Sequence, residues 1–174
     1  SPTNRTIKRA MDIALSSVML LALAVPLLLI ALLVRLDSAG SPFHLSPRVG
    51  RGGKPFRCLK FRTMYADAEE RLEQLLETDP AARDEYFRYR KLTDDPRVTR
   101  VGRVLRRLSL DEFPQLVNVL LGQMSLVGPR PYLVSELADM GPERDLIFLA
   151  RPGITGYWQV EARNEVSFEE RQAM

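Results

Sequence analysis

The sequence is poor in cysteine and histidine, with one of each among 174 residues. A single cysteine cannot form an intramolecular disulfide, and its presence fits a reducing compartment. With His44 as the only histidine, a zinc centre or a histidine-dependent catalytic triad is disfavoured. Cys58 falls in a strand-like stretch with no histidine near it in sequence. We therefore predict that Cys58 is a buried apolar side chain and not a nucleophile.

Charge is absent from residues 13–34. Only Ser16, Ser17 and Pro26 interrupt the apolar side chains of these 22 residues, a length that can cross the hydrocarbon core of a bilayer. The run is not typical of a secretory signal peptide, because it is too long and Arg35 follows it where a small-residue cleavage site would lie. We expect a membrane association that the mature protein keeps.

Pro26 lies in the middle of this run, where it removes a backbone hydrogen bond and clashes with the preceding turn, so a kink is predicted there. Basic residues flank both ends of the run, with Arg5, Lys8 and Arg9 before it and Arg35, Arg48 and Arg51 after it. The positive-inside rule therefore gives no orientation. The residues alone leave two alternatives open, a spanning helix and a re-entrant helix with both ends cytoplasmic.

Two segments after the apolar run have strand character. Residues 42–45 form at most a short strand within a loop rich in glycine, serine and proline, and residues 56–64 form a better one. Period-two alternation in the second segment would place Cys58, Lys60 and Arg62 on one face. The two cations could hold an anion there, or they could form the solvated face of an edge strand.

Residues 66–77 and 80–92 are predicted to form two charged, amphipathic surface helices without a catalytic signature. A third helix, through residues 97–108, would carry a basic stripe opposite valine and leucine, made of Arg97, Arg100, Arg103 and Arg107. Such a stripe suits anionic headgroups, phosphate ligands or nucleic acid, in agreement with the net charge of +3. A plain solvated face is the alternative.

Asp111 and Glu112 follow this basic stretch as adjacent carboxylates. Beside so many cations they stay ionised where a phosphate-bearing ligand would also be attracted, so one of them could attack phosphorus as a nucleophile. The alternative is helix capping. Residues 109–112 match a capping box with Ser109 as the N-cap, whereas Pro114 fits better if Asp111 is the N-cap. Both registers place Asp111 at a helix N-terminus, which favours an anion.

Two constrained loops each carry an arginine. Prolines on both sides of Arg130 restrict its backbone, and a rigid guanidinium suits bidentate recognition of phosphate. Arg151 opens a similar loop, and two aromatic residues follow at positions 157 and 158. These rings could stack on a base, lie at a membrane interface or belong to a core.

Several motifs occur in one order along the chain: KR at 8–9, KFRTM at 60–64, LSLDEFPQL at 108–116, GPRP at 128–131 and RPGITG at 151–156. Together they strongly resemble the bacterial monotopic phosphoglycosyl transferases, the catalytic domain of undecaprenyl-phosphate sugar phosphotransferases. The resemblance covers nearly the whole chain. It implies an α+β, mostly helical fold: a re-entrant membrane helix (residues 1–37) broken near Pro26, then a catalytic domain (residues 38–174) with amphipathic interfacial helices and a small number of short strands.

The resemblance also implies an activity at the cytoplasmic face of the bacterial inner membrane, in the first membrane step of exopolysaccharide or O-antigen synthesis. Asp111 would attack the β-phosphorus of a UDP-sugar, release UMP and form an aspartyl phosphosugar, from which undecaprenyl phosphate takes the sugar phosphate. Glu112 would bind Mg²⁺ together with Asp111, or help to position the acceptor. The remaining ligand contacts are expected from cations, namely Arg130, Arg106, Lys60, Arg151 and Arg163.

The chain departs from this family's pattern at two places. Members commonly have Ser-Pro at the helix break, where this chain has Val25 and Pro26, and often Ser-Gly or Asn-Gly where residues 161–162 are Glu-Ala. The charged insertion 66–92 resembles longer members, for which UDP-galactose or UDP-glucose is expected and which carry additional N-terminal transmembrane helices. We expect the C-terminal end to be truncated, and the basic and apolar surfaces leave room for a homodimer.

A non-catalytic peripheral membrane or polyanion-binding module is the alternative of another class. In that case Asp111 and Glu112 would only cap a helix, and the arginines would bind lipid headgroups. A phosphohydrolase is the nearest enzymatic alternative, because water could resolve an aspartyl phosphate. A nucleic-acid function would account for the arginines but would leave the apolar N-terminus without a purpose, so no nucleic-acid partner is expected.

Overall fold

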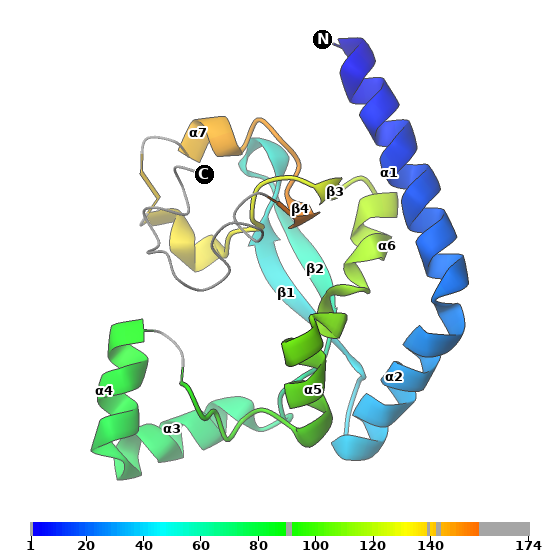
Figure 1. The fold of residues 1–174 in the computed structure, drawn as a ribbon. Helices are drawn as coiled ribbons and strands as arrows, with labels where there is room; N and C mark the ends of the chain where they lie inside the picture. The colour runs from blue at the N-terminus through cyan, green and yellow to red at the C-terminus, as the bar shows by residue number, and fades with distance from the viewer. Residues whose placement is uncertain (1, 90–91, 139, 142–143, 157–174) are drawn as a thin grey trace. The chain divides into compact units, whose positions relative to one another are not determined.

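The computed structural model describes residues 2–89, 92–138, 140–141 and 144–156. The helices are α1 (Pro2–Ala22), α2 (Ala24–Asp37), α3 (Ala68–Thr78), α4 (Pro80–Tyr89), α5 (Arg100–Leu108), α6 (Gln115–Leu120) and α7 (Arg144–Ile147). The strands are β1 (Phe43–Val49), β2 (Pro55–Phe61), β3 (Ser125–Val127) and β4 (Gly153–Thr155). Short 3-10 turns lie at Arg51–Gly53, Leu110–Glu112 and Val134–Ala138. The predicted mostly helical α+β class with few short strands is confirmed (Figure 1).

The chain divides into two compact units. The first comprises residues 1–25 and 45–60 and the described residues from 112 onward, and the second comprises residues 26–44 and 61–111. The two-stranded sheet of β1 and β2 supplies backbone to both units, because the boundaries fall within these strands. The domain division predicted between residues 37 and 38 stays a prediction.

In the first unit, α1 packs along α6 and β3 (Figure 1), and the unit has a small apolar core. Cys58, Val119 and Met124 are fully buried, and the side chains of Phe56, Leu126 and Ile154 pack around them. The prediction that Cys58 is a buried apolar residue is therefore confirmed, and burial raises the pKa of its thiol.

The second sheet of the first unit pairs β3 with β4 in parallel, with Ser125 opposite Gly153. Glycine is required at Gly153, because an added Cβ would lie 2.1 Å from the backbone nitrogen of Gly128. The amide of Gly153 also donates to the carbonyl oxygen of Pro129 at 2.8 Å. Close backbone contact therefore fixes the start of the loop that carries Arg130.

The second unit has its own core, in which Val34 of α2, Phe61 and Leu105 of α5 are buried. Helix α5 begins after Thr99, whose side chain accepts a hydrogen bond from the amide of Gly102 at 2.9 Å. Asp37 accepts from the amide of Val101 at 3.0 Å, so a carboxylate also satisfies the first turn of this helix.

The predicted charged helices are confirmed as α3 and α4, the second of which the structure describes as far as Tyr89. The predicted basic helix is confirmed as α5, but it begins at Arg100. Arg97 precedes it and pairs with Asp95, with Nη2 2.7 Å from Oδ2. That arginine is therefore engaged by a neighbouring carboxylate and does not extend the stripe.

The capping-box prediction is wrong in both registers. Ser109 ends α5 as its C-cap, with a φ of 57°, and its amide bonds back to the carbonyl of Arg106. Asp111 lies in the following 3-10 turn, and α6 begins only at Gln115, with Pro114 as an N-cap that makes no side-chain bond. The physical reason is Pro114, whose fixed φ and missing amide suit the entry to a helix and oppose a position within one.

The helix break lies at Leu23, three residues before Pro26. Proline cannot donate to the carbonyl of the residue four positions earlier, and its ring clashes with that carbonyl; here this residue is Ala22, the last of α1. Among the described residues, no single helix is long and apolar enough to cross a membrane. Taken together, residues 3–22 and 24–37 pass that test as a pair bent by 64°.

We expect Gly102→Ala to destabilise the protein, although alanine normally stabilises an exposed helix position. The added Cβ would lie 2.1 Å from the backbone oxygen of Thr63, and overpacking of this kind costs about 2–3 kcal/mol. The midpoint of thermal unfolding in detergent, followed by circular dichroism, should fall by about 5–10 °C. Val104→Ala, at a half-exposed position of the same helix, is the control and should change the midpoint little. An unchanged or raised midpoint for Gly102→Ala would contradict the packing described.

Candidate functional site

Glu112 forms an ion pair with Lys60 of β2, with Oε1 2.8 Å from Nζ. Both side chains are about three-quarters buried, at 27% and 22% exposure. The carboxylate is the last residue of the 3-10 turn after α5, and the cation is the penultimate residue of β2. The structure thus brings together two residues that lie 52 positions apart and that the sequence singled out independently.

A cavity of about 110 Å³ surrounds this pair within the first unit. Its lining residues are Arg48, Lys60, Glu112, Gln115, Arg130, Pro131, Gly153 and Ile154. Three of these side chains are cationic and one is anionic, so the cavity is suited to an additional anion such as a phosphate.

Arg130 is held at the edge of this cavity by its own loop. Its Nη2 lies 3.4 Å from Oε1 of Glu136, and the other carboxylate oxygen of Glu136 accepts from the amide of Leu133 at 2.6 Å. The predicted rigidity of this arginine is supported by the contact between Gly153 and Pro129 described above. The guanidinium is therefore oriented before any ligand binds.

Arg48 is a second arginine of the cavity, and the sequence indicated it only as one of the basic residues after the apolar run. It donates to the carbonyl of Pro131 at 3.0 Å and to the hydroxyl of Ser46 at 3.2 Å. Burial lowers the pKa of Arg48, and the nearby charge of Arg130 lowers it further. Because the positive charges of the two arginines repel each other, a bound anion would stabilise the charged form of both. Arg48 follows a loop-like stretch of glycine, serine and proline, in which no motif marks it.

Asn118 fixes the register between α6 and β2. Its Oδ1 accepts from the amide of Leu59 at 2.9 Å, and its Nδ2 donates to the carbonyl of Arg57 at 2.8 Å. The buried Gln115, on the same helix, reaches the cavity itself. Sequence reasoning missed both residues, because a buried amide in a short apolar helix has no distinguishing pattern until the neighbouring strand is known.

Asp111 belongs to the second unit, where it lies near Arg106 of α5. Arg106 donates from Nε to Oγ1 of Thr63 at 2.8 Å. Burial lowers the pKa of Arg106, and the charge of Asp111 opposes this effect. The structure therefore pairs the predicted nucleophile electrostatically with one of the predicted phosphate-binding arginines.

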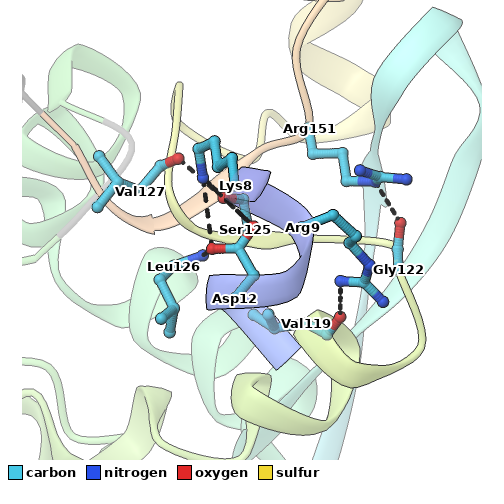
Figure 2. A network of polar contacts seen from close by, with 9 residues as sticks. All are labelled: Lys8, Arg9, Asp12, Val119, Gly122, Ser125, Leu126, Val127 and Arg151. Carbon is cyan, nitrogen blue, oxygen red and sulfur yellow. Dashed lines mark hydrogen bonds and ion pairs between the residues drawn. The ribbon is translucent and has the colours of Figure 1, made fainter. Parts of the chain in front are cut away.

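Arg151 does not line the cavity of Glu112. It lines a separate cavity of about 290 Å³ in the first unit, and its Nε donates to the carbonyl of Gly122 at 2.8 Å (Figure 2). The sequence predicts a ligand contact for both Arg130 and Arg151, and the structure places them in different cavities. Arg163 lies outside the described residues.

The second cavity borders a polar network around Asp12 of α1, which is only 4% exposed (Figure 2). Asp12 pairs with Lys8 at 3.3 Å and accepts from the hydroxyl of Ser125 at 2.9 Å and from the amide of Leu126 at 3.2 Å. Lys8 also donates to the Ser125 hydroxyl. Arg9 donates to the carbonyl of Val119 at 2.6 Å. Helix α1 is thus tied to β3 and α6 by charged side chains.

A magnesium ion held by protein ligands alone is not supported in the described part of the chain, where no three histidine, cysteine, aspartate or glutamate side chains cluster together. Magnesium is commonly held by one or two carboxylates together with substrate phosphates and water. Within the cavity, Glu112 is the carboxylate that such a site would use.

The site defines the class of protein: one with a carboxylate inside a small cavity that is lined by cations and suited to a phosphate. The chain belongs to the bacterial sugar transferase family, whose sequence pattern it matches over residues 3–174.

Three relatives illustrate the similarity. The chain is 46% identical to a UDP-galactose-lipid carrier transferase of Erwinia amylovora, over 97% of this chain and 35% of that protein. The same figures hold for an undecaprenyl-phosphate galactose phosphotransferase of Salmonella typhimurium. Identity is 45% to the exopolysaccharide production protein ExoY of Rhizobium meliloti, over 99% of this chain and 76% of that protein. The chain therefore spans about a third of the length of the first two relatives.

We expect Asp12→Ala to loosen the attachment of α1 to β3, because the amide of Leu126 loses its acceptor and Lys8 loses its ion pair, whereas the hydroxyl of Ser125 keeps the carbonyl of Val127 as an acceptor. An amide left without an acceptor costs about 1–3 kcal/mol. Hydrogen exchange followed by mass spectrometry should show at least about tenfold faster exchange in the peptide that contains Leu126. Asp12→Asn keeps one acceptor oxygen and should exchange at an intermediate rate. Parent-like exchange in Asp12→Ala would show that the network does not hold the strand.

Proposed function

We propose that this chain transfers a sugar 1-phosphate from a UDP-sugar to undecaprenyl phosphate, in the first membrane step of exopolysaccharide or O-antigen synthesis. One observation carries the proposal: Glu112 lies in a cavity lined by Lys60, Arg48 and Arg130, directly after Asp111 in the chain. The family supports the same chemistry, and so do two relatives, which are named a UDP-galactose-lipid carrier transferase and an undecaprenyl-phosphate galactose phosphotransferase.

In the first step of the proposed reaction, a carboxylate oxygen of Asp111 attacks the β-phosphorus of the UDP-sugar. A bond forms between that oxygen and phosphorus, and the bond from phosphorus to the bridging oxygen breaks. UMP leaves with the electron pair, and an aspartyl phosphosugar remains. A carboxylate needs no prior deprotonation for this attack, and the positive charge of the nearby Arg106 reduces its repulsion from the diphosphate.

In the second step, a phosphate oxygen of undecaprenyl phosphate attacks the phosphorus of the aspartyl phosphosugar. The bond from phosphorus to Asp111 breaks, the carboxylate is regenerated, and the product is an undecaprenyl diphosphosugar. Glu112 has two roles open to it, as a ligand of Mg²⁺ shared with substrate phosphates or as the group that positions the acceptor. Bound Mg²⁺ would neutralise phosphate charge.

The membrane arrangement that we propose is re-entrant, with both ends of the bent helix pair at the cytoplasmic face of the inner membrane. Apolar side chains are exposed along both helices, including Val18 and Leu21 of α1 and Leu28 and Leu36 of α2, each more than 60% exposed. Water would disfavour such surfaces, and acyl chains would not. The proline-induced break and the basic residues at both ends are consistent with a helix that returns to its starting face.

We expect Asp111→Asn to abolish the covalent intermediate, because an amide is a far poorer nucleophile than a carboxylate. The purified chain would be incubated with Mg²⁺ and a panel of labelled UDP-sugars, and UMP release and protein-bound label would be measured. The rate of UMP release should fall below about one thousandth of the parent rate. Asp94→Asn, the same change at a fully exposed side chain, is the control and should remain active.

Three outcomes of this assay would contradict the proposal. A covalent adduct that persists in Asp111→Asn would refute the assignment of Asp111 as the nucleophile. Absence of UMP release over the whole panel, with binding to lipid vesicles retained, would instead favour a non-catalytic polyanion-binding module. Release of free sugar phosphate without the lipid acceptor, at a rate that the acceptor does not change, would favour a phosphohydrolase.

The topology has its own test. Thr3→Cys and Ala39→Cys, both at exposed positions, would be introduced separately into a Cys58→Ala background and treated with a membrane-impermeant maleimide. A re-entrant pair should give labelling from the same side of the membrane at both positions. Labelling from opposite sides would show that the segment spans the bilayer.

A further inference from the structure

The larger cavity of the first unit is strongly cationic. Its walls come from α1, the 3-10 turn at Arg51–Gly53, β3 and the chain that follows α7. Five of its lining side chains are cations and only Asp12 is anionic, the cations being Arg5, Lys8, Arg9, Arg51 and Arg151. The turn is anchored to the residue that follows α7, because the amide of Gly52 donates to the carbonyl of Phe148 at 2.8 Å. The cations therefore come from three segments, namely α1, the 3-10 turn and the chain after α7, and not from a single run of basic residues.

Only part of this charge is used within the protein. Lys8 pairs with Asp12, Arg9 binds the carbonyls of Val119 and Leu120, and Arg151 binds that of Gly122 (Figure 2). Within the described part of the chain, the side chains of Arg5 and Arg51 make no hydrogen bond or ion pair, and both residues are exposed. Burial lowers the pKa of Arg151, and the charges of Arg9 and Arg51 add to this effect. A bound anion would relieve this repulsion.

The apolar side chains at the edge of the cavity, its apolar rim, indicate what kind of anion binds there. Val127 and Leu149 line the cavity and are 57% and 65% exposed. On α1, Ile7 and Met11 are each more than half exposed and begin an apolar stripe that continues through Leu15 and Val18 at helical spacing. A freely soluble phosphate would gain nothing from such a rim, whereas the acyl chains of a lipid would cover it.

We propose that this cavity binds the phosphodiester headgroup of an anionic membrane phospholipid, at a site separate from the cavity of Glu112. Arg5 and Arg51 contact the phosphate, while Val127 and Leu149 contact the first carbons of the acyl chains. The volume of about 290 Å³ is at the small end of ligand sites and suits a headgroup. The inference rests on the membrane association proposed above, but not on the transfer reaction.

The test compares two pairs of substitutions that remove the same charge. Arg5→Gln with Arg51→Gln removes the two cations that have no described partner, and Lys54→Gln with Arg57→Gln removes two exposed cations outside the cavity. Each chain would be placed in nanodiscs of phosphatidylcholine with a minor fraction of phosphatidylglycerol. Retained phosphatidylglycerol would be counted by native mass spectrometry after release into detergent.

The variant in Arg5 and Arg51 should bind phosphatidylglycerol about thirtyfold more weakly, given the usual contribution of each cation beside anionic headgroups. The control pair should change it less than threefold, and both variants should keep the parent's unfolding midpoint. Equal losses of phosphatidylglycerol binding in the two variants would refute the site and would show that diffuse surface charge attracts the lipid. Displacement of the lipid by millimolar inorganic phosphate, or by UDP-glucose, would show a soluble anion site.

This result is separable from the proposed catalysis. Phosphatidylglycerol binding in Asp111→Asn should equal that of the parent, so inactivity of the chain on every UDP-sugar would leave the lipid site standing. Conversely, UMP release together with lipid retention that does not favour phosphatidylglycerol would support the transfer reaction and refute the lipid site.

Discussion

The buried carboxylate of Asp12 is the constraint on which the first unit depends. Its bonds to Lys8, Ser125 and the amide of Leu126 attach α1 to β3. β3 pairs with β4, and the first residue of β4 bonds to the carbonyl just before Arg130. A charge removed from water is costly unless every partner is present, so this arrangement is favoured over looser ones. The position of an arginine beside Glu112 thus depends on a residue of the membrane-associated helix that we propose.

The ion pair of Lys60 and Glu112 is better understood as part of a binding site than as a source of stability. Partly buried pairs lose much of their Coulombic gain to desolvation, and their net contribution is small. In a cavity that also holds Arg48 and Arg130, the carboxylate neutralises only part of the positive charge. The phosphate of the ligand that we propose could contact Arg48 and Arg130 without breaking the pair of Lys60 and Glu112, so that a carboxylate and a phosphate could share one small cavity.

The sequence predicted most elements, because their signals are local. The strand β2, the charged helices at α3 and α4, and the basic α5 follow from periodicity and turn residues. The capping box failed because two local signals competed, and Pro114 outweighed the match at Ser109. Arg48 and Asn118 could not be found, since their roles exist only once β2 lies against α6. Arg130 and Arg151 each lie in a loop constrained by proline, yet they line different cavities.

That separation of two similar arginines bears on how a membrane-surface enzyme could keep its ligands apart. Residue type identifies the chemistry, here the recognition of phosphate, while the surrounding surface identifies the molecule that carries the phosphate. Arg130 lies beside carboxylates and a buried amide, a setting for a polar ligand that reacts. Arg151 lies beside exposed valine and leucine, a setting for a lipid that remains intact. With two cation-lined cavities on one unit, abundant anionic lipid need not compete for the cavity in which the carboxylate lies.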